Sequence, residues 1–304
     1  MTEDVDSRRA LLVDAFTDEP LAGNAAGVVP DAGGLAESQM QAIAAELGAS
    51  ETAFLRPSTA ADRRVRYFTP TREVDLCGHA TVAAHAHLFA DGVAAAGTHT
   101  LETNVGVLDV EITAEGVVWM TQDDPQVERV DVDYERVGDA LGVDSAALRD
   151  VGADLPAAVA STGLPFLVVP VNFLEHLGGA SPDMNAIADL AAAYDAAGVY
   201  AFTFDAVDAD STLHARMFAP GYGVPEDPVT GTASGACGAY LRSVDAFEGE
   251  MPDEMRFEQG HFVDRPGHVR VRVGDEVRVG GEAVTSLAGS LSVPPAEDDD
   301  IVEA

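Results

Sequence analysis

The stretch Cys77-Gly-His-Ala-Thr81 has a counterpart about half a chain later, Thr230-Gly-Thr-Ala-Ser234. Each copy opens a run of small and apolar residues, 79–90 and 232–242, that has no polar face. A helix without a polar face is usually buried. The sequence therefore predicts two central helices that begin in the same way.

The similarity between the two halves extends to both sides of these helices. Val65-Arg-Tyr-Phe-Thr-Pro70 matches Ala215-Arg-Met-Phe-Ala-Pro220, and Thr52-Ala-Phe-Leu55 matches Tyr200-Ala-Phe-Thr203. Matches that keep their order over half a chain predict two similar domains. Each half also has a helical pattern ended by glycine and a strand-like alternation, at Leu35–Leu47 before Gly48, Ala186–Ala197 before Gly198, Gly106–Ile112 and His268–Val273.

We therefore expect an α+β fold of two pseudo-symmetric domains, each a curved sheet or barrel around one central helix. The first domain is expected to span 1–128 and the second 129–284. The helix starts at Gly78-His79 and Gly231-Thr232 present free N–H groups and partial positive charge. If the domains face each other, these ends meet across a cleft, where the sequence predicts a site for a small anionic substrate.

Composition excludes several classes of function. The chain has 304 residues, with 17 basic and 52 acidic side chains and a formal net charge of −35. This charge would repel phosphates, so no nucleic-acid partner is expected. No apolar run is long enough for a membrane helix and no signal-peptide pattern begins the chain, so we expect a cytoplasmic protein. Since every basic residue is arginine and molar salt screens repulsion, we interpret the acidity as halophilic adaptation rather than a partner-binding face.

Acid and base candidates lie beside the predicted helix starts. Glu51 precedes an apolar strand, and the repeat places the apolar Val199 opposite it, although an exposed acid at a strand start is the alternative. His79 could exchange protons near neutral pH, or simply pack or cap. Asp227 is either an active-site acid or a turn residue before Pro228. These three side chains are the candidate catalytic residues.

Binding candidates are fewer. Gly231 and Thr232 offer N–H donors and a hydroxyl to an anion. Asn24 lies in Gly23-Asn-Ala-Ala-Gly27, which is most simply a turn but could line the cleft. The chain has only two cysteines and no phosphate-loop, dinucleotide or zinc motif, so we expect no metal.

Several motifs together carry a family resemblance. They resemble the phenazine-biosynthesis isomerase family, the PhzF-like proteins, over essentially the whole chain and in the right order. The resemblance implies the diaminopimelate-epimerase-like fold. It also implies that a C-terminal strand, about 285–296, returns to the first domain. The motifs are Asp14-Ala-Phe-Thr17 with Gly23-Asn24, Ser50-Glu51-Thr52, Asp75-Leu-Cys-Gly-His-Ala-Thr81 and Glu226-Asp-Pro-Val-Thr-Gly-Thr-Ala233.

The resemblance also implies roles for the site residues. It assigns acid/base catalysis to Glu51, the family histidine to His79 and a neighbouring binding glycine to Gly78. It assigns an active-site aspartate to Asp227 and a substrate-contacting hydroxyl to Thr232, where the family often has serine. The implied reaction is a cofactor-free isomerisation, in which a proton leaves one carbon and returns to another, and the family suggests a homodimer. We carry over this reaction class and not the phenazine precursor itself.

Two rival interpretations stay open. A two-base epimerase or racemase of the same superfamily needs a cysteine at each helix start, and Cys77 occupies one such place. Thr230 stands at the other, and its hydroxyl is too weak an acid to reprotonate a carbanion efficiently. The pair could still serve a one-base dehydratase. A binding protein that has lost turnover is the second rival, which substrate depletion in a screen of small carboxylates would distinguish.

Overall fold

The structure is a computed structural model that describes residues 7–151 and 155–296. The N-terminal residues 1–6, part of the stretch searched for a signal peptide, lie outside the described residues. Within the described part, no helix is long and apolar enough to cross a membrane. The chain divides into two compact units: unit 1 holds the residues up to 21, 25–118 and those from 282 onward, and unit 2 holds 22–24 and 119–281.

The division differs in two details from the domain boundary expected after residue 128. It falls between Val118 and Trp119, so the segment up to residue 128 belongs to unit 2. The short segment 22–24 also belongs to unit 2. Arg265 explains this placement, since its guanidinium donates to the carbonyls of Gly23 at 2.9 Å and Ala22 at 2.7 Å.

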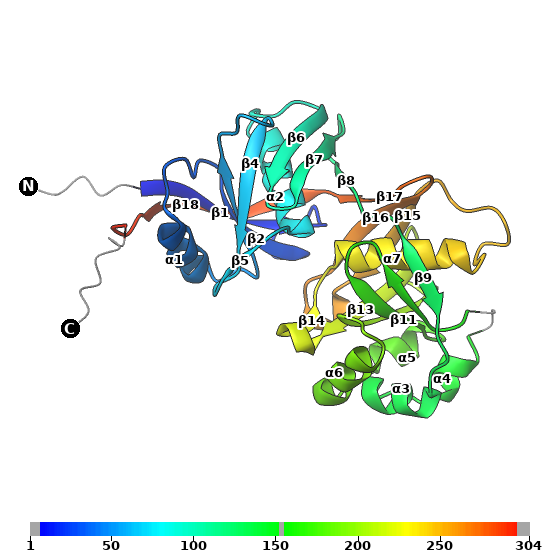
Figure 1. Cartoon of the computed structure of the whole chain (residues 1–304). Helices are drawn as coiled ribbons and strands as arrows, with labels where there is room; N and C mark the ends of the chain where they lie inside the picture. Colours follow the sequence, from blue (N-terminus) through cyan, green and yellow to red (C-terminus); the bar gives the residue numbers. More distant parts are fainter. Residues whose placement is uncertain (1–6, 152–154, 297–304) are drawn as a thin grey trace, which may run out of the picture. The chain divides into compact units, whose positions relative to one another are not determined.

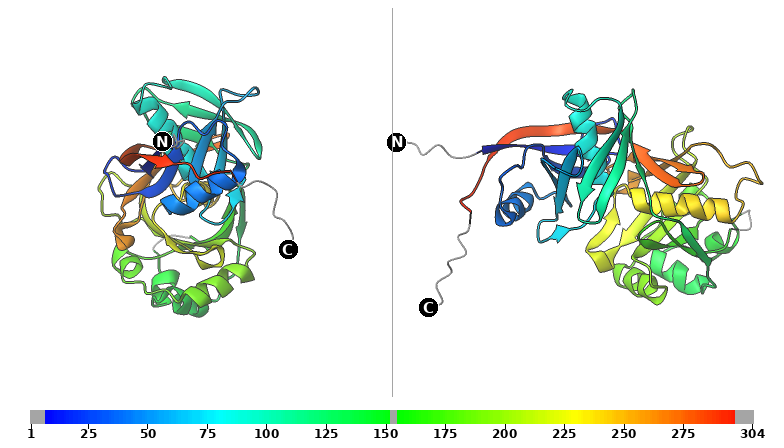
Figure 2. Two further views of the ribbon diagram at one scale, coloured as in Figure 1. Left: turned by 90° about the vertical axis from the view of Figure 1, so that its left-hand side faces the viewer. Right: turned by 45° about the horizontal axis from the view of Figure 1, so that its top comes forward.

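Unit 1 is a set of strands packed around helix α2 (Figure 1). The antiparallel pairing of β1 with β18 places the C-terminal strand in this unit, and Figure 2 shows the two strands side by side. Strands β2 and β3 are parallel. The elements are β1 (Ser7–Ala15), β2 (Asn24–Val29), α1 (Glu37–Leu47), β3 (Thr52–Arg56), β4 (Arg63–Phe68), β5 (Glu73–Val74), α2 (Gly78–Ala90), β6 (Gly97–Thr103), β7 (Gly106–Ile112) and β18 (Ala283–Ser292).

Unit 2 repeats this plan around helix α7 and adds further helices (Figure 1). Helices α3 and α6 pack against each other over a second apolar core. The elements are β8 (Val118–Thr121), which starts at the last residue of unit 1, β9 (Gln126–Arg129), α3 (Tyr134–Leu141), α4 (Ala146–Arg149), β10 (Ala158–Ser161), β11 (Pro165–Pro170), α5 (Leu174–Gly178), α6 (Met184–Ala193), β12 (Gly198–Thr203), β13 (Leu213–Ala219), η1 (Pro220–Tyr222), β14 (Val224–Asp227), α7 (Gly231–Ser243), β15 (Met255–Gln259), η2 (His261–Val263), β16 (Gly267–Val273) and β17 (Val277–Gly281).

The two central helices form where the sequence predicts them. Helices α2 and α7 each have 13 residues and begin at Gly78 and Gly231. In α2 every residue from 80 to 88 is buried, and in α7 every residue from 233 to 241 is buried. Cys237 faces the core as expected, with no exposed surface. Small side chains on every face let strands approach these helices from all sides, and the predicted α+β architecture is confirmed.

One predicted helix end is wrong. The pattern predicts a helix that continues to Ala197 and stops at Gly198, but α6 ends at Ala193 and Gly198 opens β12. The chain turns instead at Asp195, whose φ of 51° lies in the left-handed region. Aspartate adopts this conformation more readily than most residues, so the turn needs no glycine. Helix α1 does end as predicted, at Gly48 with a φ of 65°.

Candidate active site

The candidate residues of unit 1 lie together at the start of α2. Nε2 of His79 is 3.5 Å from Oε2 of Glu51 and 3.3 Å from Oγ of Ser50. Sγ of Cys77 is 3.4 Å from Nδ1 of the same histidine. The side chains of Glu51 and His79 are 24% and 13% exposed, so both are sheltered and still open to a ligand. Glu51, Cys77 and His79 thus form one group of side chains able to carry protons.

Backbone packing fixes the position of Glu51. Its carbonyl oxygen accepts a hydrogen bond of 2.9 Å from the N–H of Gly27, at the parallel pairing of β2 and β3. A Cβ at Gly27 would lie 2.3 Å from Oγ1 of Thr52, so only glycine allows the two strands to approach this closely. The turn predicted at Gly23-Asn-Ala-Ala-Gly27 is wrong, because residues 24–27 belong to strand β2. Gly27 instead helps to place the carboxylate through the strand pairing.

A buried tyrosine braces each central helix at its first turn. Tyr67 on β4 shares a hydrogen bond of 2.5 Å with Thr81, whose hydroxyl also donates to the carbonyl of Cys77. In unit 2, Tyr200 on β12 shares a bond of 3.2 Å with Ser234. Burial raises the pKa of both tyrosines, which keeps their hydroxyls protonated. The helix starts are thereby held by neutral hydroxyl pairs.

The candidate residues of unit 2 form a second group, at the start of α7. Oδ1 of Asp227 accepts from Nδ2 of Asn24 at 3.0 Å, and Oδ2 accepts from the hydroxyl of Thr230 at 2.5 Å. Nε2 of Gln259 donates to the carbonyl of Asp227 at 2.7 Å and to Oγ1 of Thr230 at 3.1 Å. Asp227 therefore holds the turn into α7 in place, with both carboxylate oxygens bound by neighbours.

Sequence reasoning missed Gln259, and no sequence signal marks it. It lies at the end of β15, well after Asp227 and Thr230 in the chain, and only the pairing of β13 with β15 brings it to the site. Asn24, by contrast, was a candidate from the sequence, and the structure places it beside Asp227. Its side-chain amide also donates to the carbonyl of Val229 at 2.8 Å, which ties segment 22–24 to the α7 turn.

Both helix starts can receive an anion. The side chains of the N-cap residues, Cys77 and Thr230, do not cap their helices within the described part of the chain. A Cβ at Gly78 would meet no other atom within 4 Å, so the space beside the first turn of α2 is open. Thr232 is half-buried in the first turn of α7. Uncapped N–H groups at a helix start are donors for a carboxylate.

The strand register corrects the repeat partner of Glu51. Thr52 lies opposite Phe68 across β3 and β4, whereas Val199 lies opposite Phe218 across β12 and β13. Because Phe68 and Phe218 are equivalent in the repeat, Thr52 corresponds to Val199. Glu51 therefore corresponds to the preceding residue, Gly198, and the predicted pairing with Val199 is wrong by one position. The asymmetry remains, since a Cβ at Gly198 would lie 2.4 Å from the carbonyl oxygen of Phe218.

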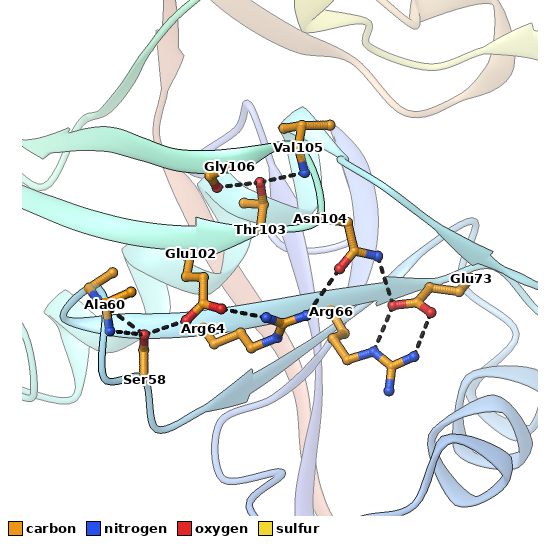
Figure 3. A network of polar contacts seen from close by, with 11 residues as sticks. Ser58, Ala60, Arg64, Arg66, Glu73, Glu102, Thr103, Asn104, Val105 and Gly106 are labelled. Carbon is orange, nitrogen blue, oxygen red and sulfur yellow. Dashed lines mark hydrogen bonds and ion pairs between the residues drawn. The ribbon is translucent and has the colours of Figure 1, made fainter.

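The repeated arginines are structural. Arg66 on β4 forms an ion pair with Glu73 on β5 and another with Glu37, and Figure 3 shows its guanidinium facing Glu73. Arg216 on β13 bonds both carboxylate oxygens of Glu226 on β14 at 2.8 Å. Each arginine thus joins two neighbouring strands in its own unit, and Arg216 also donates to the carbonyls of Leu177 at 3.1 Å and Ala180 at 3.0 Å.

The group at the start of α2 also has the donors of a metal site. Glu51, Cys77 and His79 each offer one ligand atom, and these atoms lie within 4.8 Å of one another. The sequence motifs predict acid–base chemistry for Glu51 and His79, and no metal. Acid–base chemistry stays a prediction for this group. The arrangement suits it, because a carboxylate and an imidazole in contact can exchange a proton.

Known proteins show the same fold and motifs. The family model of phenazine biosynthesis-like proteins, PhzC-PhzF, matches residues 13–289. The uncharacterized isomerase YfhB of Bacillus subtilis is 38% identical over 285 residues, which are 92% of this chain and 94% of that protein. The trans-2,3-dihydro-3-hydroxyanthranilate isomerase of Pseudomonas fluorescens is 29% identical over 92% of this chain and 98% of its own.

A solved structure agrees with these matches. The Bacillus anthracis phenazine biosynthesis protein of the PhzF family has a TM-score of 0.85 and 33% identity, and the match covers 94% of this chain and 99% of that one. The predicted diaminopimelate-epimerase-like fold is thereby confirmed. Relatives named as isomerases match nearly the full length of the chain, and so does the family model. The chain therefore belongs to the PhzC-PhzF family of phenazine biosynthesis-like proteins and is an isomerase.

Proposed function

We propose that this isomerase moves a proton between two carbons of a small carboxylate without a cofactor, and that Glu51 and His79 carry the proton. The observation that supports the proposal most is the contact of 3.5 Å between Nε2 of His79 and Oε2 of Glu51 at an uncapped helix start. A carboxylate and an imidazole in contact are suited to take a proton and return it.

The proposed reaction has two steps. The carboxylate of Glu51 takes a proton from an sp3 carbon, and the electron pair of that C–H bond shifts the neighbouring double bond. Glu51, or His79 after proton transfer between them, then delivers the proton to the far carbon of the shifted system. One C–H bond breaks and another forms, so the product is an isomer and no electron acceptor is consumed.

The groups of unit 2 are proposed to bind rather than to carry the proton. N–H groups at Gly231 and the hydroxyl of Thr232 would receive the substrate carboxylate at the start of α7. Asp227 and Asn24 would act by positioning that turn, since both are bonded to it or to each other. In this proposal one substrate is held by groups of both units, in an interdomain cleft, with Gly78 leaving room beside α2.

The substrate class is proposed from a relative. The Pseudomonas fluorescens relative is named for trans-2,3-dihydro-3-hydroxyanthranilate, a carboxylate. We propose an unsaturated small carboxylate for this chain, without assigning a phenazine pathway. We further propose that the protein is cytoplasmic and forms a homodimer. Mass measurement by light scattering tests the oligomeric state directly.

A second candidate mechanism rests on Cys77. Its Sγ lies 3.4 Å from Nδ1 of His79, a geometry in which the imidazole can accept the thiol proton. An epimerase would need a second acid at Thr230, but that hydroxyl donates to Asp227. The cysteine alternative is therefore a one-base dehydratase.

Deuterium uptake separates these mechanisms. In D2O, with unsaturated carboxylates as substrates, Glu51→Gln should lower turnover and exchange by about 10²–10⁴-fold, as expected for loss of a general acid–base group. The matched variant Cys77→Ala should retain most of the exchange, and circular dichroism should show both variants folded. Exchange stopped by Cys77→Ala but not by Glu51→Gln would replace the isomerisation with the thiol mechanism. No substrate depletion by the unmodified protein across the carboxylate screen would favour a binding protein.

A further inference from the structure

A second group of metal-ligating side chains lies in unit 2, outside the candidate active site. It consists of His214 on β13, Glu258 on β15 and His261 on η2, which offer one ligand atom each within 4.8 Å of one another. The strand register brings them together, since His214 pairs directly with Glu258 and η2 follows β15 after one residue. The ring centroids of His214 and His261 are 5.0 Å apart.

Glu258 fixes the orientation of His214. Its fully buried carboxylate accepts hydrogen bonds from Nδ1 of His214 at 2.6 Å and from the N–H groups of Val207 and Asp208 at 2.6 and 3.0 Å. A backbone N–H points at each oxygen of this carboxylate, which favours the ionised form that only accepts, so the proton of the shared bond lies on Nδ1 of His214.

This orientation leaves the other nitrogen of His214 without a partner. The side chain of His214 has no exposed surface, and its Nε2 is buried without a hydrogen bond to any described residue. Nδ1 of His261 is buried and unpartnered in the same way. Buried polar atoms normally have hydrogen-bond partners, so two buried nitrogens without a partner in one group point to a ligand that binds both.

The surroundings extend the same chemistry. His268 on β16 pairs with Glu258 from the other side, and its Nε2 is a third buried ring nitrogen without a hydrogen bond among the described residues. That nitrogen lies 3.6 Å from Oδ2 of Asp208, which also faces Arg256 at 3.2 Å. Two carboxylates and three histidines therefore share one region of unit 2.

We propose that His214, through Nε2, and His261, through Nδ1, bind a divalent transition-metal ion of the Zn2+ type. Glu258 orients His214 through its hydrogen bond to Nδ1. A carboxylate that accepts from the second nitrogen of a ligating histidine is the usual outer partner in such sites. Imidazole ligands suit Zn2+, Co2+ and Ni2+. Zn–N bonds of about 2 Å place the donors of one ion ~3–4 Å apart, and the two imidazole rings of this group have centroids 5.0 Å apart.

The ion would brace the strand that supports the start of α7. Glu258 directly precedes Gln259, which bonds the carbonyl of Asp227 and the hydroxyl of Thr230. His261 follows after Gly260, whose φ of 89° makes the sharp turn. A metal across His214 and His261 would tie β13 to η2, directly after that turn. The proposed role is structural, since Glu258 and His214 are fully buried.

Metal titration tests the proposal on the full chain. Protein stripped with a chelator and kept in molar potassium chloride, which screens its acidic surface, is titrated with Co2+ and separately with Zn2+. We expect one Co2+ per chain with the visible absorption bands of imidazole coordination, and a higher unfolding temperature with Zn2+. His261→Gln should abolish both, and Glu258→Gln should weaken the affinity by about 10–100-fold, as for other outer partners.

Two matched variants separate this site from other histidines. His79→Gln removes the imidazole of the Glu51, Cys77 and His79 group, and His176→Gln removes an exposed imidazole of unit 2. Both should bind Co2+ as the unmodified chain does. The proposal is overturned if the stripped protein takes up no Co2+, if His261→Gln binds it normally, or if His79→Gln abolishes binding. The test rests on His261→Gln rather than on a variant of His214, because His261 is only half-buried and His214 is fully buried.

Discussion

The starts of α2 and α7 share a scaffold and differ in chemistry. In both units a tyrosine hydroxyl bonds a hydroxyl one turn into the helix, and an arginine pairs with a glutamate on the next strand. The residues in front of the helices differ: in the repeat, Cys77 is equivalent to Thr230, and Glu51 is equivalent to Gly198. The carboxylate of Glu51, the thiol of Cys77 and the imidazole of His79 therefore have no counterparts at the start of α7.

Two glycines near these sites, Gly198 and Gly78, give the largest expected difference in stability between variants. At Gly198 a Cβ would lie 2.4 Å from a backbone oxygen, so Gly198→Ala should destabilise unit 2 by about 1–3 kcal/mol, as overpacking typically does. At Gly78 the space is open, so Gly78→Ala should leave stability nearly unchanged while crowding the anion site. Chemical denaturation of both variants measures this. Equal stability loss would contradict the difference in free space at Gly198 and Gly78.

The hydroxyl of Thr232 tests the binding role of unit 2. Thr232→Val keeps the shape of the side chain and removes one hydrogen bond, so ligand binding should weaken by roughly 1–2 kcal/mol. The unfolding transition should move little, because the substitution removes only the hydroxyl of a half-buried side chain in the first turn of the helix. Calorimetric titration with a substrate carboxylate measures the affinity. A variant that unfolds would make Thr232 a structural residue instead.

Acid should weaken α2 more than α7. Burial is the main cause that lowers the pKa of His85 in α2 from 6.5 to about 4, and α7 contains no histidine. Between these values the unfolded chain binds the proton and the folded chain does not, so stability falls as pH drops from about 6.5 to about 4. His85→Asn should flatten this part of the pH profile of unfolding temperature. An unchanged slope would place the acid sensitivity elsewhere.

Salt should affect both units, because acidic residues are spread along the chain. With a formal charge of −35, repulsion is strongest where screening is weakest. The unfolding temperature should rise steadily from dilute buffer to molar potassium chloride. A flat profile would contradict our proposal of halophilic adaptation.

Local sequence signals predicted much of the fold and part of the site. The small-residue runs fixed both central helices to their first residues, Gly78 and Gly231. Motif order placed Glu51 beside His79, which the structure brings within 3.5 Å. Segment ends were less certain: α6 stops at Ala193 because Asp195 can adopt the left-handed conformation. Such alternatives to glycine are hard to distinguish in a single sequence.

Long-range pairing decided the remainder. The sequence by itself determined the repeat, the two buried helices and the residue types at their starts, because side-chain size and periodicity act over a few neighbours. Only the tertiary structure decided that Gly198, and not Val199, is the repeat equivalent of Glu51, and that Gln259 holds the α7 turn. It also decided that His214, Glu258 and His261 meet. Strand register fixes these partners, and register depends on hydrogen bonds between segments far apart in the chain.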